Sequence, residues 1–149
     1  MKDLDWSNLS FGYRQTDYNV RCYYRDGKWG EIEVCSDEYL KLHMAATCLH
    51  YGQEAFEGLK AYRCPDGKVR VFRMDENAAR LQSTCRGILM PEVPTEMFEE
   101  MVKKVVRLNQ EWIPTYESGA TLYIRPLLIG TSAQVGVHPA KRRDRKSVV

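Results

Sequence analysis

The sequence predicts an α+β fold in which helices pack against a largely antiparallel sheet. Three observations predict it: two strand pairs are joined by Asp-Gly turns, two amphipathic helices follow one another, and one long strand comes after them. Neighbouring strand segments pair as hairpins, and the helices are grouped rather than alternating with strands. The pattern therefore disfavours a doubly wound parallel sheet, and the sequence contains no GxGxxG or GxxxxGK phosphate loop.

Both predicted hairpins are organised as strand, tight turn and strand. Their turns carry Asp-Gly, which supplies the positive φ angles that a tight turn requires. The first turn is at residues 26–27, and the second, at residues 65–67, begins with proline. The expected strands cover residues 20–24 and 29–34 in the first hairpin, and residues 59–63 and 69–73 in the second.

The first predicted helix covers residues 75–86. Asp75 is placed to cap its N-terminus. Ala78, Leu81 and Cys85 recur at helical spacing, so they form the face that we expect to be buried.

The second predicted helix covers residues 95–112, with Thr95 as its cap and Pro114 as the residue that ends it. Its apolar positions have a clean helical period. They are Phe98, Met101, Val102, Val105, Leu108 and Trp112.

The last predicted strand, residues 120–129, is the most apolar strand of the chain and contains an arginine. Period-two alternation places Tyr123 and Arg125 on one face. Pro126 removes a backbone donor from the ladder, so an edge position or a bulge is expected there. The opposite face should carry Leu122, Ile124 and Leu128.

Arg125 is a candidate functional residue because an unpaired buried charge is unfavourable. A guanidinium beside a phenol on a sheet surface is suited to receive a carboxylate. The alternative is an internal ion pair with Asp or Glu, and the spacing alone leaves both interpretations open.

Further candidates precede this strand. Tyr51 and Phe56 flank a short turn between two glycines, where they form either a pocket wall or part of the core. Arg80 lies beside the apolar face of the first helix, and Glu76, four residues earlier, suits a surface ion pair with it. The three histidines have no metal-ligand spacing, so no metal site is predicted.

Composition indicates one ordinary globular domain. The chain has 149 residues, of which 44% are hydrophobic and 28% charged. Its 22 basic and 20 acidic residues become 17 and 19 without the last nine residues, KRRDRKSVV. Basicity is thus confined to the tail, so no nucleic acid partner is expected. We expect residues 1–140 to be the domain and residues 141–149 a disordered or non-native tail, a nucleic-acid arm being the alternative.

The sequence also suggests a cellular location. It has no apolar run long enough for a spanning helix and no apolar signal segment, so no membrane association is expected. Five scattered cysteines without a CxxC motif fit reduced thiols in the cytoplasm.

Three blocks of sequence carry a resemblance to a known family. They are LHYGQEAFEGLKAYR, VFRMDENAARLQ and LYIRPLLIGTSAQVGVHP. In this order and spacing they resemble the N-terminal small domain of branched-chain amino acid aminotransferases, which are pyridoxal 5'-phosphate enzymes of fold type IV, the D-amino acid aminotransferase-like fold. The resemblance covers residues 5–140.

The resemblance implies roles for individual residues. Arg80 would hold the cofactor phosphate. Arg125 would pair with the distal carboxylate of glutamate, and Tyr123 would help to hold the α-carboxylate. The substrate pocket would be lined by Tyr51, Phe56, Tyr123 and a backbone N–H of the loop at Val137.

The implied activity is transfer of an amino group from leucine, isoleucine or valine to 2-oxoglutarate, in a homodimer. The family's imine lysine lies in a second domain, and neither Lys60 nor Lys68 is placed to serve. We therefore expect this chain to be a truncated small domain without a catalytic lysine and inactive alone. Alternatives are another fold type IV enzyme, such as a D-amino acid aminotransferase or an aminodeoxychorismate lyase, and a non-enzymatic interaction domain.

Overall fold

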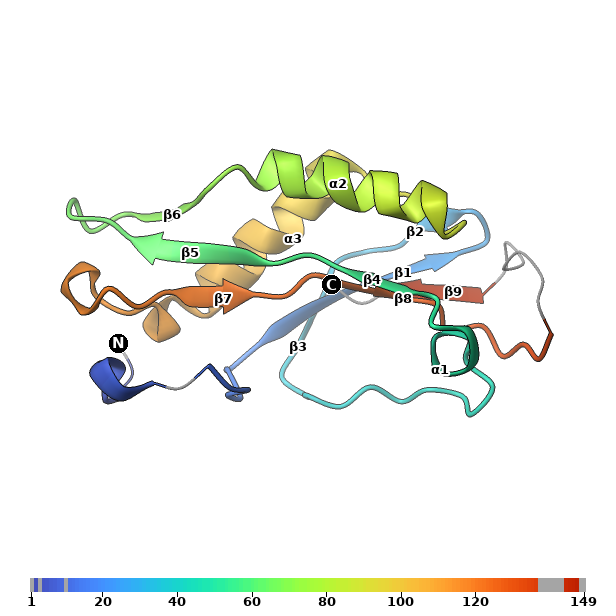
Figure 1. Ribbon diagram of the computed structural model, residues 1–149, viewed down its shortest axis with the longest axis horizontal. Coiled ribbons are helices and arrows are strands. Elements are labelled where there is room, and N and C mark those ends of the chain that lie inside the picture. Colours follow the sequence, from blue (N-terminus) through green and yellow to red (C-terminus); the bar gives the residue numbers. More distant parts are fainter. Residues whose placement is uncertain (1, 3, 10, 137–143, 148–149) are drawn as a thin grey trace.

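The computed structural model describes residues 2, 4–9, 11–136 and 144–147, and it confirms the mixed α+β class with antiparallel strand pairing. Short strands form the sheets and two longer helices pack on them (Figure 1). In chain order the elements are η1 (Trp6–Asn8), β1 (Asn19–Arg25), β2 (Lys28–Trp29), β3 (Glu33–Cys35), α1 (Thr47–Tyr51), β4 (Glu54–Phe56), β5 (Leu59–Arg63), β6 (Val69–Val71), α2 (Met74–Gly87), α3 (Thr95–Leu108), η2 (Gln110–Trp112), η3 (Tyr116–Ser118), β7 (Leu122–Ile124), β8 (Leu127–Ile129) and β9 (Asp144–Ser147).

The first hairpin is confirmed and contains a bulge. Asp26 and Gly27 have φ angles of 50° and 83°, which close a tight turn between β1 and β2. The pairing of Tyr24 with Trp29 is offset by one residue from the pairing of Arg21 with Glu33. The returning strand therefore holds one extra residue between β2 and β3, and it bends there.

The second hairpin joins a long antiparallel ribbon. β5 pairs with β6 around Gly67, whose φ is 74°, and it also pairs with β7. β4 pairs with β8 in the same register, so the two strand pairs continue each other end to end (Figure 1). We call β4, β5, β7 and β8 the central ribbon.

The central ribbon is interrupted where Glu57 and Gly58 lie opposite Pro126 and Arg125. Pro126 has no N–H to give to the ladder, but its carbonyl oxygen accepts a hydrogen bond from the Glu57 N–H at 2.9 Å. Of the two expectations for Pro126, the edge position is confirmed, because β7 is an edge strand of its sheet, and the bulge is not, because neither strand gains a residue. Pairing resumes in register on both sides of the break.

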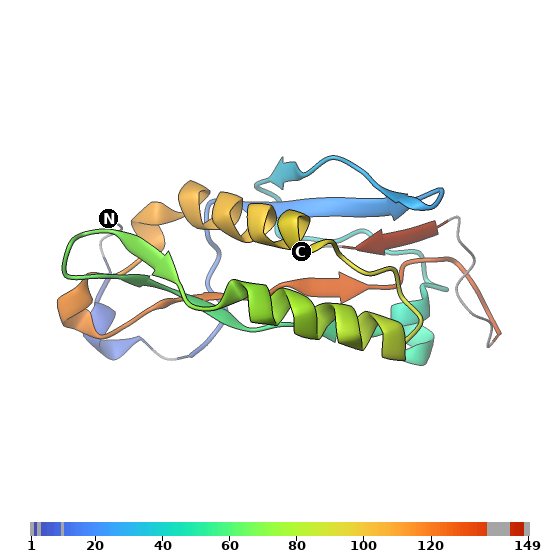
Figure 2. The same cartoon turned by 90° about the horizontal axis from the view of Figure 1, so that it is seen from above.

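Helices α2 and α3 lie side by side and cover one face of the ribbon (Figure 2). The predicted face of α2 is buried as expected. α3 also contacts β1, because Met101 packs against Val20 and Cys22. The main core joins the ribbon to both helices through Ala55, Leu59, Ala61, Ala78, Leu81, Cys85, Phe98, Val102, Val106, Ile124 and Leu128.

The helix ends differ from the predictions. Asp75 lies inside α2, and the cap position belongs to Arg73, which has a left-handed φ of 47°. Thr95 is the first residue of α3, the cap position belongs to Pro94, and the Thr95 hydroxyl accepts a hydrogen bond from Gln82. α3 ends at Leu108 rather than at Trp112, because the Asn109 side chain bonds the Val105 carbonyl and both backbone groups of Tyr18.

Two further expectations can be compared with the structure: a disordered C-terminal tail and the absence of a membrane-spanning helix. Residues 144–147 form β9, which pairs antiparallel with β1, so at these four positions the structure differs from the expected disordered tail. Within the described residues, every helix is too short or too polar to cross a membrane.

Candidate functional site

The outer face of the central ribbon carries the candidate substrate residues. Residues of β4 and β5 alternate between buried and exposed, and Phe56 is 60% exposed. The Tyr123 ring meets the Phe11 ring edge to face, with 5.4 Å between centroids. We call Phe11, Phe56 and Tyr123 the aromatic ledge.

Arg125 lies over this ledge. Its Nε donates a hydrogen bond to the phenol oxygen of Tyr123 at 3.0 Å, which confirms that both side chains share one face. Its guanidinium carbon stands 4.3 Å from the Phe56 ring centroid and 5.2 Å from that of Tyr123. Among the described residues no carboxylate forms an ion pair with Arg125, so the alternative of an internal ion pair is not realised there.

Gly58 makes room for this arrangement. It lies opposite Arg125 in the ribbon, and a Cβ added to it would stand 2.8 Å from the phenol oxygen of Tyr123. A side chain at residue 58 would therefore displace the phenol from its position beside Arg125.

Tyr51 lies apart from the aromatic ledge. It is the last residue of α1, which Gly52 closes with a φ of 57°. The phenol oxygen of Tyr51 accepts a hydrogen bond from the Gly136 N–H at 2.6 Å. No ring contact or hydrogen bond joins Tyr51 to the ledge in the described part of the chain. Val137, the next residue along that loop, lies outside the described residues.

Arg80 pairs with Glu57, not with Glu76. Its Nε and Nη2 donate to the two carboxylate oxygens of Glu57 at 2.9 and 2.6 Å. Glu76 instead accepts from Arg73 at 2.6 Å. The expected i,i+4 surface pair is therefore wrong, because packing of α2 on the ribbon brings a carboxylate from 23 residues away into better, bidentate geometry.

The Glu57 carboxylate is buried and highly connected. Glu57 is 4% exposed, whereas the Arg80 side chain is 69% exposed. Asn77 donates a third hydrogen bond to Glu57, at 2.8 Å. Burial raises the pKa of this carboxyl, but the hydrogen bonds from Arg80 and Asn77 outweigh burial and hold the pKa below its usual value. Glu57 therefore remains ionised, and the same contact raises the pKa of Arg80.

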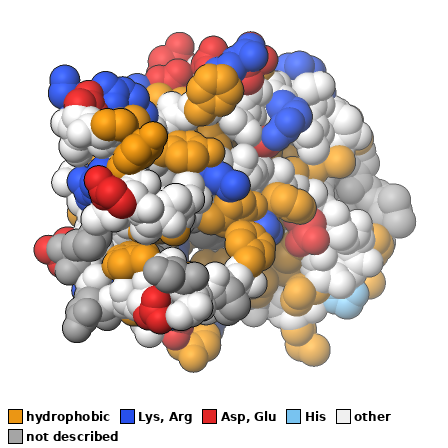
Figure 3. Space-filling view, turned by 60° about the vertical axis from the view of Figure 1, so that its left-hand side comes forward, with side chains coloured by type: hydrophobic (Ala, Val, Ile, Leu, Met, Phe, Trp, Pro, Cys, Tyr) orange, Lys and Arg blue, Asp and Glu red, His pale blue; other side chains and the backbone are white. Residues whose placement is uncertain are grey.

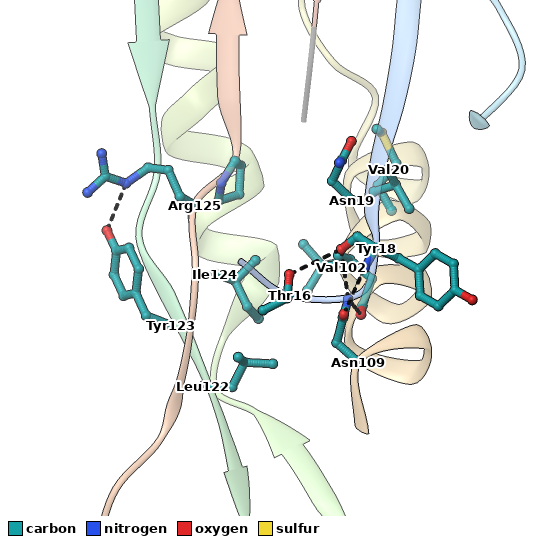
Figure 4. A pocket seen from close by; sticks show the side chains of 13 residues that line it. Thr16, Tyr18, Asn19, Val20, Val102, Asn109, Leu122, Tyr123, Ile124 and Arg125 are labelled. Carbon is teal, nitrogen blue, oxygen red and sulfur yellow. Dashed lines mark hydrogen bonds between the residues drawn. The ribbon is translucent and has the colours of Figure 1, made fainter. Parts of the chain in front are cut away.

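A cavity of about 180 Å³ lies on the other side of β7 from the aromatic ledge. Its walls include Val20 of β1, Val102 of α3 and Ile124 of β7. Figure 4 shows Ile124 and Leu122 on the cavity side of the strand, while the side chains of Tyr123 and Arg125 point away. Tyr123 and Arg125 are also among the residues that line the cavity, so it adjoins the Arg125 site, although their side chains point away from it.

Sequence reasoning missed Glu57 and Asn77, and it identified Gly58 only as one of the two glycines that bound the turn after Tyr51. A signal for Glu57 was present: with Ala55, Leu59 and Ala61 it occupies the buried positions of a period-two pattern. A charged residue in that series indicates a buried charge with a partner. Nothing in the nearby sequence identifies Arg80 as the partner, because the pairing depends on how α2 packs on the ribbon.

The fold matches part of the fold of branched-chain amino acid aminotransferases, which are enzymes of fold type IV. The branched-chain amino acid aminotransferase of Escherichia coli superposes with a TM-score of 0.66 at 25% identity, covering 89% of this chain and 38% of that chain. A second such enzyme, the T.th. branched-chain amino acid aminotransferase complexed with N-(5'-phosphopyridoxyl)-L-glutamate, gives a TM-score of 0.62 at 25% identity and covers 90% and 40%.

The chain is homologous to a portion of branched-chain amino acid aminotransferases. It is 53% identical to the Haemophilus influenzae enzyme over 140 residues, or 94% of this chain and 41% of that enzyme. Identity with the Helicobacter pylori enzyme is 46% over the same shares. The chain thus spans about 41% of the length of these relatives. No family model matches the sequence.

Proposed function

We propose that this chain forms the N-terminal small-domain part of a branched-chain amino acid aminotransferase. The observation that carries the proposal is the Arg125 guanidinium, which is held by Tyr123 over the aromatic ledge and has no carboxylate partner among the described residues. A cation presented in this way is suited to a substrate carboxylate. Homology over 94% of the chain supports amino acids and 2-oxo acids as the class of substrate.

The ledge suits two kinds of side chain. The distal carboxylate of glutamate or 2-oxoglutarate would receive a charge-assisted hydrogen bond from Arg125. The branched apolar chain of leucine, isoleucine or valine would instead lie against Phe56 and Tyr123. Tyr123 would also help to hold the α-carboxylate, while Tyr51 and the backbone N–H at Val137 would complete the pocket.

Arg80 fits the phosphate of pyridoxal 5'-phosphate. Two of its five guanidinium N–H groups are engaged by Glu57, so three remain for an anion, and the side chain is open to solvent. When bound, the cofactor would act as the electron sink for transamination. In this chain Arg80 would bind and orient it, and we expect the lysine that holds it covalently to lie outside these 149 residues.

Further parts of the proposal concern assembly and location. We expect a homodimer in which a partner subunit completes the substrate site, as the exposure of the aromatic ledge suggests. All five cysteines are free thiols, which supports a cytoplasmic location.

The test is an amino-donor assay on the protein in its full natural length. L-leucine, L-isoleucine and L-valine, each with 2-oxoglutarate, should yield glutamate, and D-alanine should not. Activity restricted to D-amino acids would support the D-amino acid aminotransferase alternative instead. Absence of both activities in cofactor-loaded protein would leave the interaction domain as the remaining interpretation and would reject the proposal.

A further inference from the structure

We infer that Glu57 is a positioning residue for the cofactor phosphate, because it fixes the guanidinium of Arg80 in one orientation at the surface of the domain. The inference rests on the proposed role of Arg80 and extends it to a residue that has no direct contact with the ligand.

The geometry of the pair leaves a defined edge of Arg80 free. Glu57 engages Nε and one N–H of Nη2, so the unused donors are the second N–H of Nη2 and both N–H groups of Nη1. These donors lie in the guanidinium plane on the side away from Glu57. A tetrahedral anion can therefore be bound through two parallel N–H groups while the first bidentate contact stays intact.

Glu57 itself is held rigidly. Its carboxylate accepts from Asn77 as well as from Arg80, and its backbone N–H donates to the Pro126 carbonyl. A buried carboxylate with this many fixed donors has one orientation, whereas an exposed arginine without a partner samples many rotamers. The buried acid therefore reduces the number of orientations that Arg80 would lose on binding an anion.

The location of Glu57 links it to the substrate site. Its backbone N–H bonds Pro126, the residue after Arg125. Its neighbour Phe56 belongs to the aromatic ledge, and its neighbour Gly58 lies against Tyr123 of that ledge. At the break in the central ribbon, the Glu57 side chain lies on the face that the helices cover and holds Arg80 of α2, while Arg125 lies on the outer face. A positioning role explains why this buried site carries an acid rather than an apolar residue.

A purely electrostatic effect of Glu57 and a positioning effect predict opposite changes in phosphate binding when Glu57 is replaced by glutamine. A carboxylate near a phosphate repels it, so replacing Glu57 by glutamine should strengthen phosphate binding if only charge matters. If Glu57 orients Arg80, the same change should weaken it, because the amide presents an N–H₂ group to a guanidinium donor and the fixed bidentate contact is lost.

The experiment measures dissociation constants of the apoprotein, in its full natural length, for pyridoxal 5'-phosphate and for pyridoxal by tryptophan fluorescence. The ratio of the two constants is the phosphate preference. Arg80→Met should lower it by about 10–100-fold, the contribution of a charge-assisted hydrogen bond. Glu57→Gln should lower it by roughly tenfold, and the double variant should be no worse than Arg80→Met alone.

Glu76→Gln is the matched control. Glu76 lies on the same helix in an equally short ion pair, but with Arg73, so the phosphate preference should stay within about twofold. If Glu57→Gln fails to fold, Asn77→Ala removes one support from the carboxylate at a partly exposed position and should lower the preference in the same direction.

The possible results distinguish the role of Arg80 in phosphate binding from the role of Glu57 in positioning Arg80. An unchanged preference in Arg80→Met would reject Arg80 as the phosphate residue, and the inference with it. A lowered preference in Arg80→Met with an unchanged or higher one in Glu57→Gln would reject only the inference. Equal weakening of both ligands by Glu57→Gln, with a lower melting temperature, would mark Glu57 as structural and would also reject the inference.

Discussion

At the scale of single residues, one short break in the central ribbon gives two arginines different surroundings. Arg125 lies on the outer face, where it donates a hydrogen bond to the Tyr123 phenol and lies over two aromatic rings. Arg80 is also exposed, but it forms an ion pair with the buried carboxylate of Glu57. The proposed substrate carboxylate and cofactor phosphate thus have separate receptors, one held by an aromatic ledge and the other by an acid.

The position of Tyr123 depends on the absence of a side chain at residue 58. Gly58→Ala would place a methyl group against the phenol, which can move because it is the far end of a side chain. We expect the free energy of unfolding to fall by less than about 1 kcal/mol, below the usual loss from overpacking. The half-reaction with glutamate should slow more than that with leucine, because Arg125 loses its hydrogen bond.

Urea unfolding and single-turnover kinetics measure these two effects. Gly87→Ala is the control, since nothing lies within 4 Å of a Cβ there. Wild-type kinetics in Gly58→Ala would show that the Tyr123–Arg125 contact has no functional role.

At the scale of elements, sequence patterns within a few residues correctly predicted the turns and the buried faces of helices and strands. Asp-Gly turns, the apolar face of α2 and the alternation around Arg125 all occur as predicted, because turn chemistry and side-chain period act within a few residues. The ends of the helices were not predictable in this way. The end of α3 depends on Asn109 bonding Tyr18, which lies 91 residues away in the chain.

The buried face of α3 supplies an element-scale prediction. Phe98 is fully buried between α2 and the ribbon, so Phe98→Ala should lower the free energy of unfolding by about 3–5 kcal/mol. Phe72, just before α2, is 76% exposed, and Phe72→Ala should change it by less than about 0.5 kcal/mol. Urea denaturation compares the two variants. Similar losses in both would show that the helices do not pack as described.

At the scale of the whole molecule, hydrophobic side chains remain on the surface. Figure 3 shows several clusters of them on one face, with Lys and Arg side chains between them. Phe11, Phe56 and Tyr51 are 86, 60 and 44% exposed. Exposed apolar area of this kind promotes association, so we expect a dimer or a higher oligomer. Analytical ultracentrifugation measures this, and a strict monomer at high concentration would contradict it.

Another whole-molecule prediction concerns the 149-residue polypeptide by itself. It should form no stoichiometric borohydride-stable adduct with pyridoxal 5'-phosphate at one lysine, and it should not transaminate leucine. The reason is our expectation, implied by the resemblance, that the imine lysine lies outside these 149 residues. Mass spectrometry after borohydride treatment locates any adduct. A single modified lysine together with leucine turnover would contradict the prediction.

The central claim is that Arg125 receives the distal carboxylate of the acidic substrate. Its most direct test is single-turnover kinetics of Arg125→Met in the cofactor-loaded protein of full natural length, with Arg70→Met as the control. Arg70 is an exposed arginine bound to Asp66 in the second hairpin, away from the ledge.

A charge-assisted hydrogen bond contributes about 1.5–3 kcal/mol. The specificity constant for glutamate should therefore fall by about 10–100-fold in Arg125→Met, while that for leucine should fall less or rise. If Arg125 were only structural, through its contacts with Phe56 and Tyr123, its loss would instead weaken both reactions in parallel. Equal losses for leucine and glutamate, with a lowered melting temperature, would contradict the assignment of Arg125 to the substrate.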